Sequence, residues 1–179
     1  MLTIERRSTA ELTAAEVRRL RALLAAAFLD EEAFSEDDWQ HALGGTHLLG
    51  RLEGEIVAHA AVVRRVLEAD GRPIEAGYVE AVAVAPELQG RGHGTTLMRA
   101  VGELIATEYQ LGALGTGVQP FYERIGWQRW LGPTSVRTAA GPQRTPDEDG
   151  GILILRTPTT PPLDLTAPLS CEWRPGDVW

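Results

Sequence analysis

The chain has 179 residues, of which 44% are hydrophobic and 23% charged, and its formal net charge at pH 7 is −8. This length and composition are typical of a globular protein, so we expect residues 1–179 to form a single domain. The negative charge disfavours nucleic acid and anionic membranes as partners and favours a cationic partner.

The residue types also exclude several chemistries. All 17 basic residues are arginine, which excludes a lysine Schiff base. Cys171 is the only cysteine, and the four histidines lack metal-ligand spacing. We therefore expect no disulfide within the chain and no metal. The most apolar stretch, residues 23–29, is too short to span a membrane, and no signal peptide is visible, so we expect a cytoplasmic protein.

Helix signals dominate the first part of the chain after a weakly alternating segment, 2–6, that predicts a strand. Thr13 and Glu16 form a capping-box pattern, and the apolar residues that follow have helical spacing. A second short helix is expected to start at Ser35 and to carry Trp39.

Strand signals follow. Two apolar runs, 46–52 and 55–63, flank Glu53-Gly54 and predict a hairpin. Residues 70–73, Asp-Gly-Arg-Pro, predict another turn, which leads into a nearly continuous apolar strand at 76–86.

The second half predicts alternating elements and then a tail. The expected elements are a helix at about 94–107, a strand at 110–114, a short helix at 120–126, and late strands at 127–133 and 150–157 around a Gly/Pro-rich loop. The tail, from about 157 to 179, has little periodicity, but its Leu, Trp and Val content favours docking on the body. This order predicts an α/β fold with a mixed sheet.

Three glycines lie close together in ELQGRGHGTT, residues 87–96, between the apolar strand and the helix. Glycine lets the backbone approach a ligand closely, and the first turn of a helix attracts anions. The segment therefore indicates a diphosphate site, although a plain turn is the alternative. It lacks the Lys of a P-loop and the spacing of a dinucleotide-binding fingerprint.

Residues 89–94, Gln-Gly-Arg-Gly-His-Gly, resemble the (Gln/Arg)-x-x-Gly-x-(Gly/Ala) loop of the GNAT N-acetyltransferase superfamily. The resemblance implies that the loop amides hold the pyrophosphate of acetyl-coenzyme A and that the preceding strand pairs with its pantetheine arm. The amide of Val82 would donate to the thioester oxygen. The implied cofactor-binding residues are Val82, Ala83, Val84, Gln89, Gly90, Arg91, Gly92, His93 and Gly94.

A closer resemblance covers roughly residues 35–179. The segments DWQHALGGTHLL, IVAHAAVV, GYVEAVAV, YQLGAL, LGPTSV, RTPDEDG and CEWRPGDVW resemble the aminoglycoside 2'-N-acetyltransferases, which modify these antibiotics and thereby confer resistance. The resemblance implies one acetyltransferase domain with its cofactor-binding core at about 76–126, a mixed, mostly antiparallel sheet flanked by helices, and a docked C-terminal tail. It also implies a homodimer.

Two residues are candidates for proton transfer. Strand alternation would place Glu80 on one face with Tyr78, Val82 and Val84, and the resemblance implies that Glu80 is the base that deprotonates the sugar ammonium. Tyr122 matches the tyrosine that protonates the coenzyme A thiolate. An exposed strand glutamate and a core aromatic are the alternatives. Cys171 has no activating neighbour in the sequence, so we expect direct transfer without a covalent intermediate.

A polycationic substrate requires carboxylates. Acidic residues cluster at 30–39, 145–150 and 176–179, although most such clusters are solvated surface. By resemblance the substrate contacts are Asp38, Glu80, Glu148, Asp177 and Trp179.

The chain also departs from the aminoglycoside 2'-N-acetyltransferases. Those enzymes have an acid where Ala33 stands, a serine where Gly115 stands and an aspartate where Glu148 stands, and their segment corresponding to 115–121 is about two residues longer. These changes affect specificity more than the transfer chemistry. The alternatives are an acetyltransferase for another polyamine or amino sugar, and a non-catalytic acyl-coenzyme A-binding protein.

Overall fold

The computed structural model describes residues 1–28 and 33–179. It divides into two compact units. The first unit comprises residues 1–63 and 79–103, and the second comprises residues 64–78 and 104–179. Two long strands, β3 (Glu55–Ala69) and β4 (Arg72–Val84), contribute residues to both units.

The remaining elements follow the order that the sequence predicts, with additions in the C-terminal third. The other strands are β1 (Thr3–Ser8), β2 (Thr46–Leu52), β5 (Leu111–Gly115), β6 (Gln128–Arg129), β7 (Thr134–Thr138), β8 (Gly141–Arg144), β9 (Ile152–Arg156) and β10 (Leu169–Glu172). The helices are α1 (Ala14–Ala27), α2 (Glu36–His41), α3 (His93–Glu108) and α4 (Gln119–Glu123), with short 3-10 turns η1 (Thr9–Glu11), η3 (Pro86–Leu88) and η4 (Pro146–Glu148).

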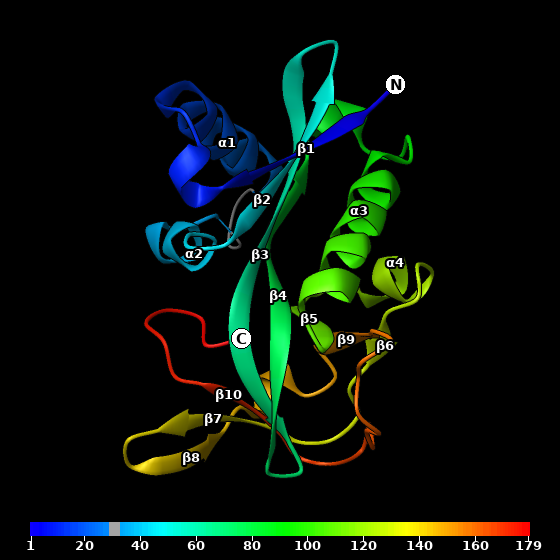
Figure 1. Cartoon of the computed structure of the whole chain (residues 1–179). Helices are drawn as coiled ribbons and strands as arrows, with labels where there is room; N and C mark the ends of the chain where they lie inside the picture. The colour runs from blue at the N-terminus through cyan, green and yellow to red at the C-terminus, as the bar shows by residue number, and fades with distance from the viewer. Residues whose placement is uncertain (29–32) are drawn as a thin grey trace. The chain divides into compact units, whose positions relative to one another are not determined.

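In the first unit, β1, β2 and the first part of β3 form an antiparallel ladder. Helices α1 and α2 lie on one side of these strands and α3 lies on the other (Figure 1). The predicted turn between β2 and β3 is confirmed: Glu53 and Gly54 have φ of 52° and 91°, the conformation of a two-residue hairpin turn. Apolar side chains of α1, among them Leu20 and Leu24, pack into a core with Trp39.

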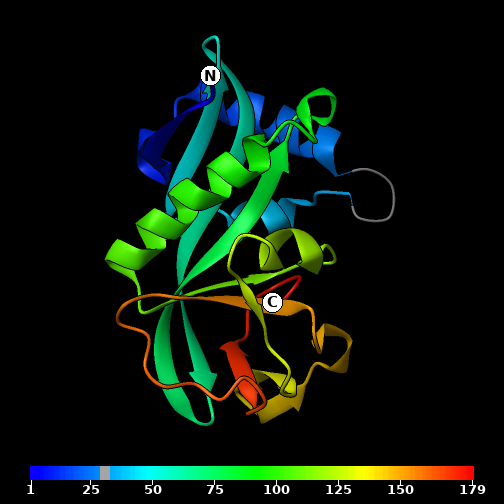
Figure 2. The same cartoon turned by 90° about the vertical axis from the view of Figure 1, so that its right-hand side faces the viewer.

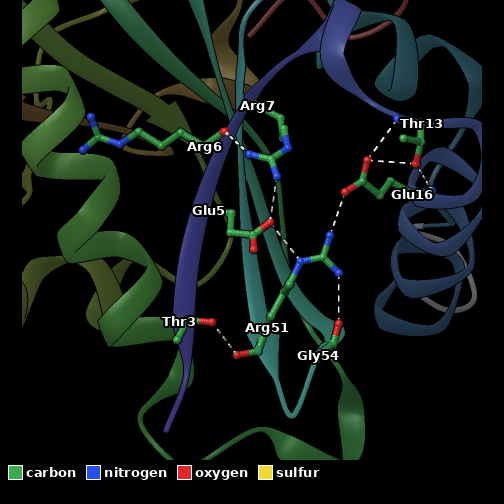
Figure 3. A network of polar contacts seen from close by, with 8 residues as sticks. All are labelled: Thr3, Glu5, Arg6, Arg7, Thr13, Glu16, Arg51 and Gly54. Atoms are coloured by element: carbon green, nitrogen blue, oxygen red, sulfur yellow. Dashed lines mark hydrogen bonds and ion pairs between the residues drawn. The ribbon is translucent and has the colours of Figure 1, made fainter.

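The predicted helix starts are confirmed by their caps. The Thr13 hydroxyl accepts a hydrogen bond from the amide of Glu16, and the Glu16 carboxylate accepts from the amide of Thr13. The other oxygen of Glu16 binds Arg51 on β2, which also binds Glu5 on β1 (Figure 3). The cap of α1 is therefore tied to the sheet by ion pairs.

In the second unit the sheet order is β6-β9-β5-β4-β3-β10-β7-β8. The pairs β4/β5 and β10/β7 are parallel, whereas the other recorded pairs are antiparallel. The strand β10, drawn in red, lies beside the yellow β7–β8 hairpin (Figures 1 and 2). The predicted tail docking is confirmed, and part of the tail is a strand.

The predicted fold class is confirmed, because the chain has a mixed, mostly antiparallel sheet with flanking helices. None of the helices in the described ranges is long and apolar enough to cross a bilayer. The same ranges contain no group of three or more His, Cys, Asp or Glu residues suited to hold a metal ion.

Candidate active site

The glycine segment forms the loop between η3 and α3 in the first unit. Gly90 and Gly92 have φ of 72° and 83°, a conformation that favours glycine. A Cβ atom at either position would meet no atom within 4 Å, so the loop is open on that side. It leads directly into the first turn of α3, whose amides have no carbonyl partners earlier in the helix. The loop therefore has the geometry of an anion site.

Gln89 ties this loop to the end of β4. Its side-chain amide donates a hydrogen bond to the carbonyl of Val84, at 3.1 Å. The ladder between β4 and β5 covers Ala76–Tyr78, and β4 continues beyond it to Val84. Gln89 thus orders the junction between the candidate cofactor strand and the glycine loop.

Glu80 is half-buried on β4, but the strict alternation expected around it is wrong. The next residue, Ala81, has a φ of 51°, which interrupts the regular strand. Residues 76–79 are all buried before this point, whereas buried and half-buried residues alternate after it, with Ala83 and Ala85 buried. The irregularity at Ala81 means that Glu80 and Val82 cannot be assigned to one face by simple alternation.

Tyr122 lies on α4 in the second unit and is 6% exposed. Its ring packs edge-on against Phe121 and Trp127, with centroids 4.9 and 6.1 Å away. Burial raises the pKa of Tyr122 to about 12. The phenol therefore stays protonated over the whole physiological range and can act as a proton donor.

Three of the predicted substrate contacts come together in the second unit. Burial and the charges of Asp177 and Asp147 raise the pKa of Glu148 above its usual value. The amide of Trp179 donates to the carboxylate of Asp177, and its indole N–H donates to the Thr145 hydroxyl, at 2.9 Å. Because Thr145 immediately precedes η4, which ends at Glu148, these contacts join the tail to that turn.

A buried arginine fixes the tail segment that carries Asp177. Arg65 on β3 is 4% exposed, and its guanidinium lies over the Tyr78 ring, 4.7 Å from the centroid. It donates to the side chain and the carbonyl of Glu172 and to the carbonyl of Val178. The Cys171 thiol also donates to the carbonyl of Val178, at 3.2 Å. The tail is therefore held by main-chain contacts on both sides of residues 173–177.

Asp38 has a local structural role in the first unit. One of its carboxylate oxygens accepts hydrogen bonds from the amide and the hydroxyl of Ser35, and so closes the capping box of α2. Residues 30–32 of the predicted acidic cluster lie outside the described residues. Sequence reasoning treated Asp38 only as a substrate contact, although the Ser-x-x-Asp spacing also carries the signal of a cap.

Comparison with known proteins identifies the family. The family model described as an acetyltransferase (GNAT) domain matches residues 8–130. An aminoglycoside 2'-N-acetyltransferase of Mycolicibacterium fortuitum is 45% identical over 153 residues, which cover 83% of this chain and 78% of that protein.

Solved structures agree on the fold. The Escherichia coli GNAT family N-acetyltransferase YhbS, in complex with CoA, has a TM-score of 0.63 and 15% identity, covering 96% of this chain and 88% of that chain. An acetyltransferase of Brucella melitensis, in complex with acetyl-CoA, has a TM-score of 0.60 and 17% identity, covering 90% and 92%. The chain spans only 34% and 33% of two longer solved chains that it also matches.

The chain belongs to the GNAT acetyltransferases and is an acyltransferase rather than a non-catalytic binding protein. Within that superfamily it belongs to the aminoglycoside 2'-N-acetyltransferase family, which the sequence segments resembled.

Proposed function

We propose that this protein transfers the acetyl group of acetyl-CoA to the 2'-amine of an aminoglycoside, and that antibiotic modification is its role. Acetyl-CoA, the cosubstrate of GNAT acetyltransferases, supplies an activated acyl group as a thioester. The open glycine loop and the first turn of α3 suit its diphosphate, as their positive-φ glycines and helix amides indicate. The residues that would bind it are Val82, Ala83 and Val84 on β4 and Gln89 to Gly94 in the loop.

One observation carries the choice of substrate. Burial, and after it the nearby charge of Asp177, raise the pKa of Glu148 above its usual value. Two carboxylates brought together repel each other unless a cation lies beside them. A polycationic sugar would supply that charge. Trp179, which is 4% exposed and binds the Thr145 hydroxyl through its indole N–H, is proposed as a contact on the family resemblance alone. Asp38 and Glu80 complete the proposed substrate contacts.

The proposed chemistry is direct transfer. Glu80 removes a proton from the substrate ammonium, through water, and the neutral nitrogen bonds to the thioester carbonyl carbon as the C–S bond breaks. The amide of Val82 donates to the thioester oxygen as negative charge develops there. Tyr122 gives its proton to the leaving thiolate, and the newly acylated nitrogen then passes its surplus proton through water to the Tyr122 phenolate. Its pKa of about 12 keeps that proton available at any pH at which the enzyme works.

The test compares aminoglycosides with a 2'-amine and with a 2'-hydroxyl, with acetyl-CoA present, by following thiol release. We expect release with the 2'-amino compounds only, and equal rates for both groups would contradict the proposed position of transfer. Glu80→Gln should flatten the rise of kcat/KM with pH, with Glu87→Gln, an exposed glutamate on η3, as the matched control. An unchanged pH profile for Glu80→Gln would remove Glu80 as the base.

Acetylation of another polyamine or amino sugar is the second candidate. Glu148 replaces the family aspartate, and Ala33 and Gly115 also depart from the family pattern, which supports a different substrate preference. A panel that includes spermidine and glucosamine separates the two candidates by kcat/KM. A homodimer and a cytoplasmic location remain predictions, and light scattering tests the former.

A further inference from the structure

Two histidines form a buried hydrogen-bonded pair in the first unit. His47 on β2 and His59 on β3 are both fully buried. The Nδ1 atom of His47 lies 2.9 Å from the Nε2 atom of His59, and the ring centroids are 5.2 Å apart. Neither histidine belongs to the site proposed above.

Each end of the pair has a further partner. The Nδ1 atom of His59 lies 2.8 Å from the carbonyl oxygen of Ala81 on β4. At the other end, the Nε2 atom of His47 lies 2.9 Å from the hydroxyl of Thr9. That hydroxyl accepts a hydrogen bond from the amide of Gly44, also at 2.9 Å. A series of hydrogen bonds therefore links Gly44 to Ala81, with a longer side contact from the Thr9 hydroxyl to the carbonyl oxygen of Gly45, at 3.4 Å.

The group at the Ala81 end of these hydrogen bonds determines which ring nitrogens carry a hydrogen. A carbonyl oxygen can only accept, so the Nδ1 atom of His59 must carry a hydrogen. A neutral imidazole has one N–H, and the Nε2 atom of His59 must therefore accept from the Nδ1–H of His47. The Nε2 atom of His47 then carries no hydrogen and accepts from the Thr9 hydroxyl at 2.9 Å, while the carbonyl oxygen of Gly45 lies farther from that hydroxyl, at 3.4 Å. Both rings are Nδ1–H tautomers.

Burial supports the neutral state that this assignment needs. Desolvation, together with the neighbouring His47, lowers the pKa of His59 to about 3, and desolvation lowers that of His47 to about 4. The ring of Trp39, whose centroid is 6.3 Å from that of His47, carries no charge. Both rings are therefore neutral at physiological pH, and each hydrogen bond keeps the donor and the acceptor assigned above.

The carbonyl at the end of the chain belongs to the residue that interrupts β4. Among the described residues with positive φ other than glycine, Glu53 and Asp70 lie in hairpin turns, whereas Ala81 lies within a strand. This conformation is unfavourable for alanine and persists only where its surroundings hold it. The hydrogen bond from His59 is such a restraint, because a different φ and ψ at this point would turn the carbonyl away.

We infer that His59, oriented by His47, is a positioning residue that holds the irregular backbone at Ala81 and thereby directs Glu80 on one side and the amide of Val82 on the other. The inference rests on the proposed function, in which Glu80 is the base and Val82 binds the thioester oxygen. Neither histidine touches the reacting atoms. They affect the rate only by holding the peptide unit between Ala81 and Val82 on β4.

The first test is independent of activity. Long-range ¹H–¹⁵N spectra of the whole protein distinguish the imidazole tautomers of His47 and His59. We expect the Nδ1–H pattern for both rings between pH 6 and 8, and an Nε2–H pattern for His59 would overturn the inference. The test holds whether or not aminoglycosides are the substrates.

The second test uses matched variants. His59→Leu removes the donor, whereas the side-chain amide of Asn in His59→Asn stands near the place of Nδ1 and can still donate. We expect His59→Leu to lower kcat by about 10- to 100-fold with little change in the KM for acetyl-CoA, since small misplacements of reacting groups have effects of that size. His59→Asn should recover most of this loss. Equal losses in both variants would contradict the inference.

Ala81→Gly provides the decisive control, because glycine adopts positive φ without strain. In the wild-type background we expect kcat to stay within about two-fold. In the His59→Leu background Ala81→Gly should restore at least half of the lost kcat on a logarithmic scale, and no restoration would overturn the inference. Calorimetric titration with coenzyme A checks that each variant still binds the cofactor. If the wild type binds coenzyme A but acetylates no amine, the proposed function fails while the tautomer result stands.

Discussion

The guanidinium of Arg65 donates a hydrogen bond to the carbonyl of Val178, at 2.8 Å, and another to the carbonyl of Glu172, at 3.0 Å. One buried cation therefore holds both ends of the tail segment that carries Asp177. This relationship connects the middle of a long strand with a proposed substrate contact more than a hundred residues away in the sequence.

Arg65→Lys should loosen that segment, because one ammonium cannot occupy both donor positions, Nε at the Glu172 carboxylate and Nη2 at the two carbonyls. We expect a loss of about 1–3 kcal/mol in the free energy of unfolding. We also expect the KM for an aminoglycoside to rise about ten-fold while the affinity for acetyl-CoA stays unchanged. Denaturation curves and calorimetry measure the two effects. Arg64→Lys is the matched control, since Arg64 is exposed and pairs with Glu75 at the surface. Equal effects of the two changes would contradict the role of Arg65.

Glu148→Gln should stabilise the ligand-free protein at neutral pH. The pKa of Glu148 is raised in the folded state, so as pH rises the unfolded chain loses this proton first and the folded state becomes less stable. The variant and the wild type should therefore melt together below about pH 4, the usual range of a glutamate. The variant should melt at a higher temperature at pH 8. Thermal melts at both pH values test this. A bound aminoglycoside should reduce the difference in melting temperature between the variant and the wild type at pH 8. A wild type that melts at the higher temperature at pH 8 would contradict the raised pKa of Glu148.

Gly115→Ser, which restores the family residue, should be tolerated. A Cβ atom there would lie 3.4 Å from the Tyr78 hydroxyl and 3.8 Å from the carbonyl carbon of Trp179, which are ordinary contact distances. We expect a change in unfolding free energy below about 0.5–1 kcal/mol and an altered preference among aminoglycosides. Gly132→Ala is the contrasting control. Its Cβ would lie 1.9 Å from the carbonyl oxygen of Ala167, so we expect a loss of at least about 3 kcal/mol. Equal melting temperatures for Gly115→Ser and Gly132→Ala would contradict the difference in space around the two glycines.

Tyr122→Phe should lower kcat by about 10²- to 10⁴-fold, the range for loss of a general acid. The KM values should change little, because the ring packing against Phe121 and Trp127 is kept. With the pKa of the phenol at about 12, the wild-type rate should show no decline from this group below pH 10. Steady-state kinetics from pH 6 to 10 measure this, with Tyr109→Phe as the control. A full rate for Tyr122→Phe would remove it as the acid.

Local signals in the sequence predicted the first half of the fold well. The capping box at Thr13, the helix start at Ser35 and the turn at Glu53-Gly54 need only a few neighbouring residues to specify them, and the structure confirms all three. The turn at Asp70-Gly71 is also confirmed, although it is shorter than expected because Arg72 already opens β4.

Other features depend on distant residues and could not be predicted. The strand β10 was hidden in a proline-rich tail because its pairing with β7 comes from a segment some thirty residues earlier. The break at Ala81 had no signal, since alanine rarely adopts positive φ and its support comes from His59 on another strand. The candidate site residues were predicted from the family resemblance. The structure then showed that Glu148, Asp177 and Trp179 lie near one another.

The buried thiol of Cys171 makes the docked tail observable. Burial raises its pKa to about 11, and its hydrogen bond goes to Val178, so at neutral pH it presents neither a thiolate nor an accessible sulfur to a reagent. Because the sequence contains no second cysteine, every alkylation event marks a moment at which the tail has lifted. The rate of labelling with iodoacetamide therefore measures how often the last residues separate from Cys171.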